Sequence, residues 1–174
     1  IKELERIALK HNLIVLSDEV YERIIFDDKK HYSVLARPAL VNNSIAVFSF
    51  GKTFHATGWK TGYVVAPPAL TKEIRKAHQF IVFSVNTPIQ VALAEYMKTP
   101  EHYNSLGKFY QQKRDQFLSF IKGSSLQPLN CYGSYFQLLS YESISKQGDM
   151  AMAEELTIKH KIASIPVSVF YQDK

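Results

Sequence analysis

Three short apolar runs in the first 66 residues predict the strands of a sheet. Residues 13–16 are four consecutive apolar residues, residues 44–50 form a second, largely apolar run, and residues 61–66 form a third that stops at Pro67. Runs of this length are typical of strands that are buried on both faces, as in a parallel sheet. The second and third runs lie too close together for a helix between them. We therefore expect a mostly parallel sheet with one antiparallel member, in an α/β protein.

Helical periodicity dominates elsewhere in the chain. Apolar residues recur at intervals of three and four, which predicts helices at residues 2–11, 70–81, 88–98, 101–122 and 149–160. Asn12 is expected to close the first helix in a left-handed conformation.

The second half of the chain has the pattern of a small α+β unit. Residues 135–139 and 162–165 predict two short strands, and the long helix at 101–122 is a plausible connector. We place a domain boundary inside that helix. Its expected buried positions are Leu106, Phe109, Phe117, Phe120 and Ile121.

Composition and charge narrow the function classes. The chain has 174 residues, 46% of them hydrophobic and 21% charged, which are ordinary values for a globular protein. Its formal net charge of +5 is scattered, and without zinc-finger cysteines or a recognition helix it gives little support for nucleic-acid binding. The single cysteine, Cys131, excludes an internal disulfide and fits a reducing compartment. No apolar run is long enough to span a bilayer. We expect a cytoplasmic protein without a metal site and without a nucleic-acid or membrane partner.

The first polar cluster follows residues 13–16 directly. Asp18 comes at the end of this predicted strand and Tyr21 three residues later. In α/β sheets, ligands bind at the carboxyl ends of strands, so Asp18 could face a cationic ligand atom and Tyr21 could supply a phenol to the same place. The alternative for Asp18 is a helix N-cap.

The second cluster ends the next strand. Ser49 lies three residues before Lys52. A lysine at the end of a buried strand is unusual, and loss of water around its amine would lower the lysine pKa and make it nucleophilic toward a carbonyl. The alternative is a surface lysine whose charged end reaches solvent.

The third cluster is a glycine-flanked lysine. Lys60 lies between Gly58 and Gly62, which suggests tight backbone and a phosphate contact. The spacing is not that of a Walker A motif. A plain glycine turn is the alternative.

Together these clusters match what pyridoxal 5′-phosphate requires. A lysine forms an imine with its aldehyde, a carboxylate keeps the ring nitrogen protonated, a phenol can bond the ring oxygen, and hydroxyls and cations bind the phosphate. The spacing D-x-x-Y, S-x-x-K, a cation eight residues after the lysine, and then glycine is specific when taken jointly.

At these positions the sequence resembles the class I/II aminotransferases of fold type I, over residues 1 to about 171. The nearest subgroup is that of the methionine and kynurenine (glutamine) aminotransferases. The resemblance implies that Lys52 forms the internal aldimine and moves the proton. It also implies that Asp18 pairs with the pyridinium nitrogen, that Tyr21 bonds the ring oxygen, and that Ser49 and Lys60 bind the phosphate. Many aminotransferases have arginine where this chain has Lys60, so the charge is kept but bidentate binding is lost.

The resemblance also frames the smaller motifs. Asn86 and Thr87 resemble a segment near the partner subunit's active site, although a helix cap is the simpler interpretation. Residues 133–136 resemble the small-domain segment that borders the substrate pocket in this family, and we expect Tyr135 in the core. His55 is expected to be a packing or surface residue. Cys131 is expected to be buried.

Family members are more than twice as long as this chain. The resemblance therefore implies that residues 1–105 are the C-terminal half of the cofactor-binding large domain, with a mostly parallel sheet in a three-layer αβα arrangement. Residues 106–174 would be most of an α+β small domain. A fragment of this kind is expected to be inactive alone.

The function expected from the resemblance is transfer of an amino group from an amino acid, with methionine or an aromatic amino acid as candidates, to a 2-oxo acid. This places the protein in amino-acid metabolism, biosynthesis included, as a homodimer. Two alternatives stay open: a pyridoxal-phosphate-dependent carbon–sulfur lyase on the same fold, and a non-catalytic aminotransferase-like domain of a regulator.

Overall fold

The computed structural model describes residues 1–172 and divides into two compact units. Unit 1 comprises residues 1–116 together with 131–136, and unit 2 comprises residues 117–130 and those from 137 onward. The division along the chain falls inside helix α7 (Leu106–Ile121). The assignment of residues 1–105 and 106–174 to two domains stays a prediction.

Unit 1 holds a three-stranded sheet with helices before and after it. Its elements are α1 (Lys2–Lys10), β1 (Val15–Asp18), η1 (Val34–Ala36), α2 (Pro38–Val41), β2 (Ser44–Ser49), α3 (Phe50–Thr53), η2 (Thr57–Trp59), β3 (Gly62–Val65), α4 (Pro68–Ile81), α5 (Thr87–Tyr96), α6 (Glu101–Asn104) and the first part of α7.

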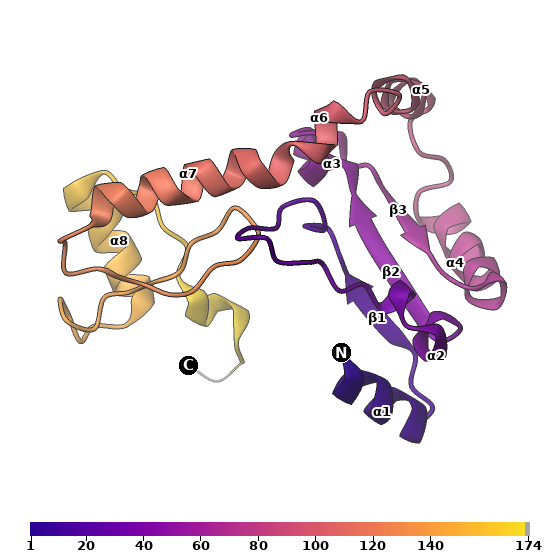
Figure 1. Cartoon of the computed structure of the whole chain (residues 1–174), viewed down its shortest axis with the longest axis horizontal. Helices are drawn as coiled ribbons and strands as arrows, with labels where there is room; N and C mark the ends of the chain where they lie inside the picture. Colours follow the sequence, from indigo (N-terminus) through magenta and orange to yellow (C-terminus); the bar gives the residue numbers. More distant parts are fainter. Residues whose placement is uncertain (173–174) are drawn as a thin grey trace. The chain divides into compact units, whose positions relative to one another are not determined.

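The sheet has the expected mixed topology. The strand order is β1-β2-β3, in which β1 and β2 are parallel and β2 and β3 are antiparallel, and Figure 1 shows β2 between its neighbours. Asp18 pairs with Val47, and Ser49 pairs with Gly62. The prediction of a parallel sheet with one antiparallel member is confirmed.

The core of unit 1 lies around the inward positions of β2. Alternate residues of β2 are buried, and helices α1 and α2 with turn η1 contribute the rest of the cluster, whose members are Ala8, Val34, Leu40, Ala46 and Phe48. The helix α1 ends as predicted, since Asn12 has φ 49° and the amide N–H of Leu13 donates to the Ala8 carbonyl at 2.9 Å.

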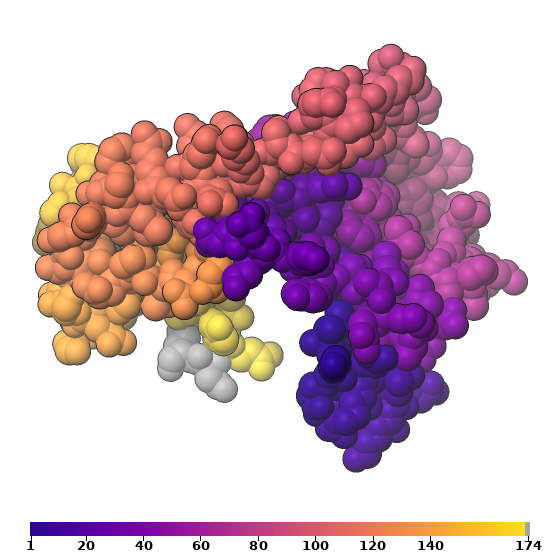
Figure 2. Space-filling view, viewed as in Figure 1, coloured from indigo at the N-terminus to yellow at the C-terminus, as the bar shows by residue number. Residues whose placement is uncertain are grey.

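The prediction that the strands are buried on both faces is wrong. Leu16 of β1 is 70% exposed, and all four residues of β3 are exposed. The reason is that the described residues bury the sheet only around Ala46 and Phe48. Helix α4 likewise ends in exposed apolar residues, with Phe80 87% exposed, and in Figure 2 the side chains of α4 and α5 form an outer margin of unit 1.

The predicted helix 101–122 is interrupted, and its aromatic face is not core. It divides at Ser105, whose hydroxyl donates to the Glu101 carbonyl at 2.9 Å, a bond that competes with helix continuation. Leu106 is buried as expected, whereas three predicted core residues are exposed: Phe109, Phe117 and Phe120. The helix approaches residues 23–27 through Gly107 and Arg114 instead, so its contact there is close and polar.

Unit 2 contains a short hairpin and a helix. Its elements are the last part of α7, β4 (Gln127–Pro128), β5 (Leu139–Ser140), α8 (Asp149–His160) and η3 (Val167–Phe170). Helix α8 matches its prediction. The predicted strand at 135–139 is reduced to Leu139 because Tyr135 and Phe136 belong to unit 1, and no strand is assigned at 162–165. No helix within residues 1–172 has both the length and the apolar character needed to cross a membrane.

Candidate active site

The residues predicted to carry the chemistry come to one edge of the sheet. Asp18 ends β1 and Ser49 ends β2, and because these strands are parallel their carboxyl ends share an edge. Gly62 begins the antiparallel β3 opposite Ser49, so Lys60, two residues earlier, also enters at this edge. The arrangement is the one in which open α/β sheets bind ligands.

Asp18 closes a turn rather than a helix. Its Oδ1 accepts a hydrogen bond from the Val20 amide N–H at 3.2 Å, and the side chain is exposed. No helix begins at Asp18 among the described residues, so the N-cap interpretation is not the one realised. Its second oxygen has no hydrogen bond within residues 1–172 and is available to a cationic group.

Lys52 lies in the helical turn α3 that follows β2, whereas the sequence predicted it directly after the strand at residues 44–50. Ser49 is the N-cap of α3, and its hydroxyl accepts from the Lys52 amide N–H at 3.3 Å. Gly51 is required by space here, because a Cβ would lie 3.0 Å from Thr57 Cα. The turn therefore fixes the backbone of the lysine by local hydrogen bonds and close packing.

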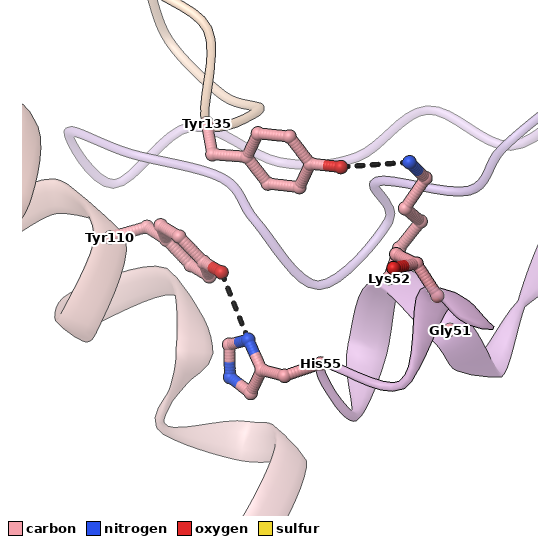
Figure 3. A pocket seen from close by; sticks show the side chains of 6 residues that line it. Gly51, Lys52, His55, Tyr110 and Tyr135 are labelled. Carbon is pink, nitrogen blue, oxygen red and sulfur yellow. Dashed lines mark hydrogen bonds between the residues drawn. The ribbon is translucent and has the colours of Figure 1, made fainter. Parts of the chain in front are cut away.

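The Lys52 amine points toward the hydroxyl of Tyr135, as Figure 3 shows. Its Nζ donates to Tyr135 Oη at 2.8 Å and lies 5.8 Å from the ring centroid of Tyr21. A cavity of about 340 Å³ adjoins the amine and is lined by Gly51, Lys52, His55, Thr57, Tyr110 and Tyr135.

The electrostatics of this amine differ from expectation. The hydrogen bond to Tyr135 raises the pKa of Lys52 and outweighs the opposing effect of burial. The predicted lowering of the lysine pKa is therefore wrong for this structure, because the amine has a phenol oxygen as partner. Burial and then the Tyr135 hydroxyl raise the pKa of Tyr21. For Tyr135 burial is opposed by hydrogen bonds from Lys52 and Tyr21, which together lower its pKa.

Lys60 is exposed and held in an unusual backbone conformation. It has φ 52° and ψ 40° at the end of η2, and its amine has no hydrogen bond or ion pair among the described residues. Gly62 is explained by packing, since a Cβ would lie 2.3 Å from the Phe48 carbonyl oxygen, whereas a Cβ at Gly58 would meet nothing within 4 Å. The glycine turn and an accessible cation thus coexist in this segment.

Three residues of the cavity were missed as site residues from the sequence. Tyr135 was expected in the core, but it is 37% exposed and bonds Lys52. His55 was expected to be a packing or surface residue, and it is exposed, with its Nδ1 3.0 Å from the Tyr110 hydroxyl (Figure 3). No sequence pattern links these three residues, which come from distant segments; only the short spacing between Lys52 and His55 was a signal.

Two smaller expectations have mixed outcomes. Asn86 caps α5, because its Oδ1 accepts from the Ile89 amide N–H at 3.1 Å, which confirms the cap interpretation. Cys131 is only half-buried, and its thiol donates to the Gly133 carbonyl at 3.0 Å. The expectation of a buried cysteine is therefore wrong.

The donor set at the sheet edge fits pyridoxal phosphate. The free oxygen of Asp18 suits a protonated ring nitrogen, the Lys60 amine and Ser49 hydroxyl suit a phosphate, and Tyr21 and Lys52 supply a phenol and an amine between them.

Comparisons with known proteins identify the family of this chain. The family model of aminotransferase class I and II matches residues 1–173. The methionine aminotransferase of Escherichia coli K12 is 50% identical over 164 residues, which is 94% of this chain and 42% of that protein. The kynurenine–oxoglutarate transaminase of Dictyostelium discoideum is 34% identical, over 99% of this chain and 45% of that protein.

A solved structure shows the same fold. The crystal structure of YbdL from Escherichia coli, a protein with a methionine aminotransferase function, superposes with a TM-score of 0.94 at 48% identity, covering 98% of this chain and 46% of that one. This chain thus spans a little under half the length of these relatives. Their names disfavour the lyase and regulator alternatives. The match to the family model over nearly every residue leads to one conclusion: the chain belongs to the class I and II aminotransferases, whose cofactor is pyridoxal phosphate.

Proposed function

We propose that this chain is part of an enzyme that transfers an amino group from an amino acid to a 2-oxo acid. The observation that carries the proposal is the meeting of Asp18, Ser49 and Lys52 at one edge of the sheet. The relatives named as methionine and kynurenine aminotransferases support methionine or an aromatic amino acid as the donor.

The cofactor would supply an electron-withdrawing ring that stabilises negative charge on the substrate carbon. Asp18 would hold a carboxylate against the ring nitrogen and keep that nitrogen protonated. Its exposed, singly bonded side chain can do so without breaking the turn at Val20. Tyr21 would donate its hydroxyl to the ring oxygen, and its raised pKa keeps it protonated and able to donate.

Lys52 would have two tasks in this enzyme. Its amine would bind the cofactor aldehyde covalently and, once released, would move a proton between two carbons. The helical turn α3 fixes the position of the lysine backbone through Ser49. A base that acts in both directions has to be within reach of both carbons, and the long side chain on a fixed backbone meets this need.

Ser49 and Lys60 would bind the phosphate. Ser49 already accepts one hydrogen bond and retains its own O–H to donate, and Lys60 contributes an unpaired positive charge. A lysine acts here as a point charge, so the hydroxyl supplies the direction that a bidentate arginine would give.

The larger assembly is part of the same proposal. We infer that residues 1–105 belong to the cofactor domain and residues 106–174 to the small domain, and that the enzyme is a cytoplasmic homodimer. The single cysteine supports a reducing compartment. Gel filtration with light scattering would test the dimer.

Covalent trapping tests the proposed function. The full-length protein is loaded with pyridoxal phosphate and reduced with borohydride, and the labelled peptide is identified by mass spectrometry. Label on Lys52, lost in Lys52→Ala but kept in Lys72→Ala on α4, supports the proposal. Label on another lysine, or wild-type transamination by Lys52→Ala, would overturn it.

A further inference from the structure

Tyr135 reaches the Lys52 amine from 83 residues away, and backbone hydrogen bonds hold it there. The segment 131–136 runs beside residues 24–26, which follow Tyr21 closely in the chain. Ile25 and Gly133 form an antiparallel bridge, and two further bonds flank it. These are Phe26 N–H to Tyr132 O at 2.9 Å and Ser134 N–H to Ile24 O at 3.0 Å.

Arg114 fastens the same segment from α7. Its guanidinium donates to the Cys131 carbonyl at 2.7 Å and to both carboxylate oxygens of Asp27, at 2.6 and 2.7 Å. Only 12% of the Arg114 side chain is exposed. This bidentate contact joins residues 27 and 131 and limits movement of the segment that carries Tyr135.

The backbone next to Tyr135 is constrained as well. Gly133 cannot carry a side chain without displacement, because a Cβ would lie 2.7 Å from the Ile24 carbonyl oxygen. Ser134 adopts φ 71°, which is unfavourable for a residue with a Cβ. Strained residues of this type concentrate at functional sites, where the surrounding structure enforces them. The constraint here sets the direction of the next side chain, Tyr135.

Two tyrosines lie around the amine. Tyr21 packs edge-on against Tyr135 with ring centroids 5.2 Å apart. Tyr135 accepts the hydrogen bond from the Lys52 amine at 2.8 Å. The titratable groups facing the amine are these two tyrosines, while His55 and Tyr110, across the cavity, bond to each other. The phenol oxygen of Tyr135 is the acceptor at 2.8 Å from the amine, while the ring centroid of Tyr21 lies 5.8 Å away.

We propose that Tyr135 is a catalytic residue whose hydroxyl oxygen holds the amine of Lys52 while that amine carries the proton it moves. The inference rests on the proposed function of Lys52. The neutral amine takes a proton from the substrate carbon, becomes an ammonium, and gives the same proton to the second carbon. Tyr135 keeps its own proton throughout and accepts one N–H of the ammonium, so no charge or atom is left unbalanced.

The test compares two phenylalanine variants of the full-length protein. Tyr135→Phe removes the acceptor and keeps the ring. Tyr132→Phe is the matched control, because it lies in the same segment with its ring against Lys29 instead. The readout is the pH dependence of Lys52 acetylation by acetic anhydride in the cofactor-free protein, measured by mass spectrometry of the Lys52 peptide.

The expected result is a lower midpoint for Lys52 in Tyr135→Phe, by about one pH unit, and an unchanged midpoint in Tyr132→Phe. In the loaded enzyme kcat should fall roughly 10- to 100-fold in Tyr135→Phe, the value of a hydrogen bond to a charged group, with little change in KM. An unchanged midpoint and an unchanged kcat in Tyr135→Phe would overturn the inference.

A second variant keeps the inference testable if Tyr135→Phe does not fold. Gly133→Ala keeps the phenol but pushes the segment away from Ile24, and it should lower the Lys52 midpoint in the same direction. A wild-type midpoint in a folded Gly133→Ala protein counts against the inference. A different result would overturn the proposed function. Transamination by Lys52→Ala at the wild-type rate would do so, independently of the result for Tyr135→Phe.

Discussion

The carboxylate of Glu19 lies 2.6 Å from Nε2 of His31, and only 3% of the Glu19 side chain is exposed. Its other oxygen accepts the Val34 amide N–H at 3.1 Å. Glu19 follows Asp18 directly, so the pair of buried Glu19 and exposed His31 connects the loop before η1 to the segment that carries the predicted cofactor carboxylate. Burial opposes the charge, but the hydrogen bonds from His31 and its neighbours outweigh it and lower the pKa of Glu19.

We expect His31→Ala to lower the free energy of unfolding by about 1–3 kcal/mol at neutral pH, because a buried carboxylate loses its partner. A carboxyl with a lowered pKa stabilises the fold above its unfolded value, and this contribution disappears as pH falls through the lowered value. The gap between wild type and His31→Ala should therefore close on acidification. Urea unfolding across this pH range measures it, with the exposed His11→Ala as control. A gap of constant size would contradict the explanation.

The contribution of Glu22 to stability changes with pH in the opposite direction to that of Glu19. Its Oε2 is buried without a hydrogen-bond partner, and burial raises the pKa of the carboxyl. A folded-state pKa above the unfolded value means that the folded state binds more protons, so stability is lost as pH rises from the unfolded value through the raised one.

Glu22→Gln should match wild type in acid and become more stable than wild type as pH increases toward neutrality. Urea midpoints measured over this range give the comparison. Glu142→Gln, an exposed change on unit 2, should leave the pH profile parallel to wild type. If the pH profile of Glu22→Gln were also parallel to that of wild type, the explanation by burial of the Glu22 carboxyl would be wrong.

Gly62 and Gly58 offer a matched pair of alanine substitutions around Lys60. At Gly62 a Cβ would sit 2.3 Å from the Phe48 carbonyl oxygen, inside the β2–β3 pairing, whereas at Gly58 there is open space. Gly62→Ala should cost about 1–3 kcal/mol, because either the strands or the carbonyl must shift. Gly58→Ala should stay within about 0.5 kcal/mol of wild type. Equal denaturation midpoints for the two variants would show that the strands separate more easily than their register implies.

The sheet could be predicted from sequence because its signals are local. The apolar runs at 13–16 and 44–50 and their polar ends placed Asp18 and Ser49 at one edge, and the short connection before Gly62 gave the antiparallel strand. Helix α8 was predicted correctly as well, because its periodicity is also a local signal. Periodicity reports burial only if a partner surface exists, which is why Phe120 was misjudged.

The environment of Lys52 could not be predicted because it is made by distant contacts. Tyr135 depends on the bridge between Ile25 and Gly133 and on the fork of Arg114, none of which leaves a pattern in sequence. Because the sequence does not reveal the Tyr135 phenol, desolvation alone suggested a lowered pKa for Lys52. The hydrogen bond to Tyr135 raises that pKa instead.

Asp18→Asn separates cofactor binding from folding. Asparagine keeps an oxygen that can accept the Val20 N–H, and the side chain is exposed, so thermal stability should be unchanged. What is lost is the negative charge offered to the ring nitrogen. A hydrogen bond to a charged group is worth about 1.5–3 kcal/mol, so pyridoxal phosphate should bind roughly 10- to 100-fold more weakly to the full-length variant. Asp28→Asn is the control, since Asp28 is also exposed and lies outside the sheet edge. Cofactor titration followed by absorbance gives both affinities. Wild-type affinity in Asp18→Asn, together with wild-type turnover, would remove Asp18 from the site and with it the assignment of the sheet edge as the place where the ring nitrogen is held.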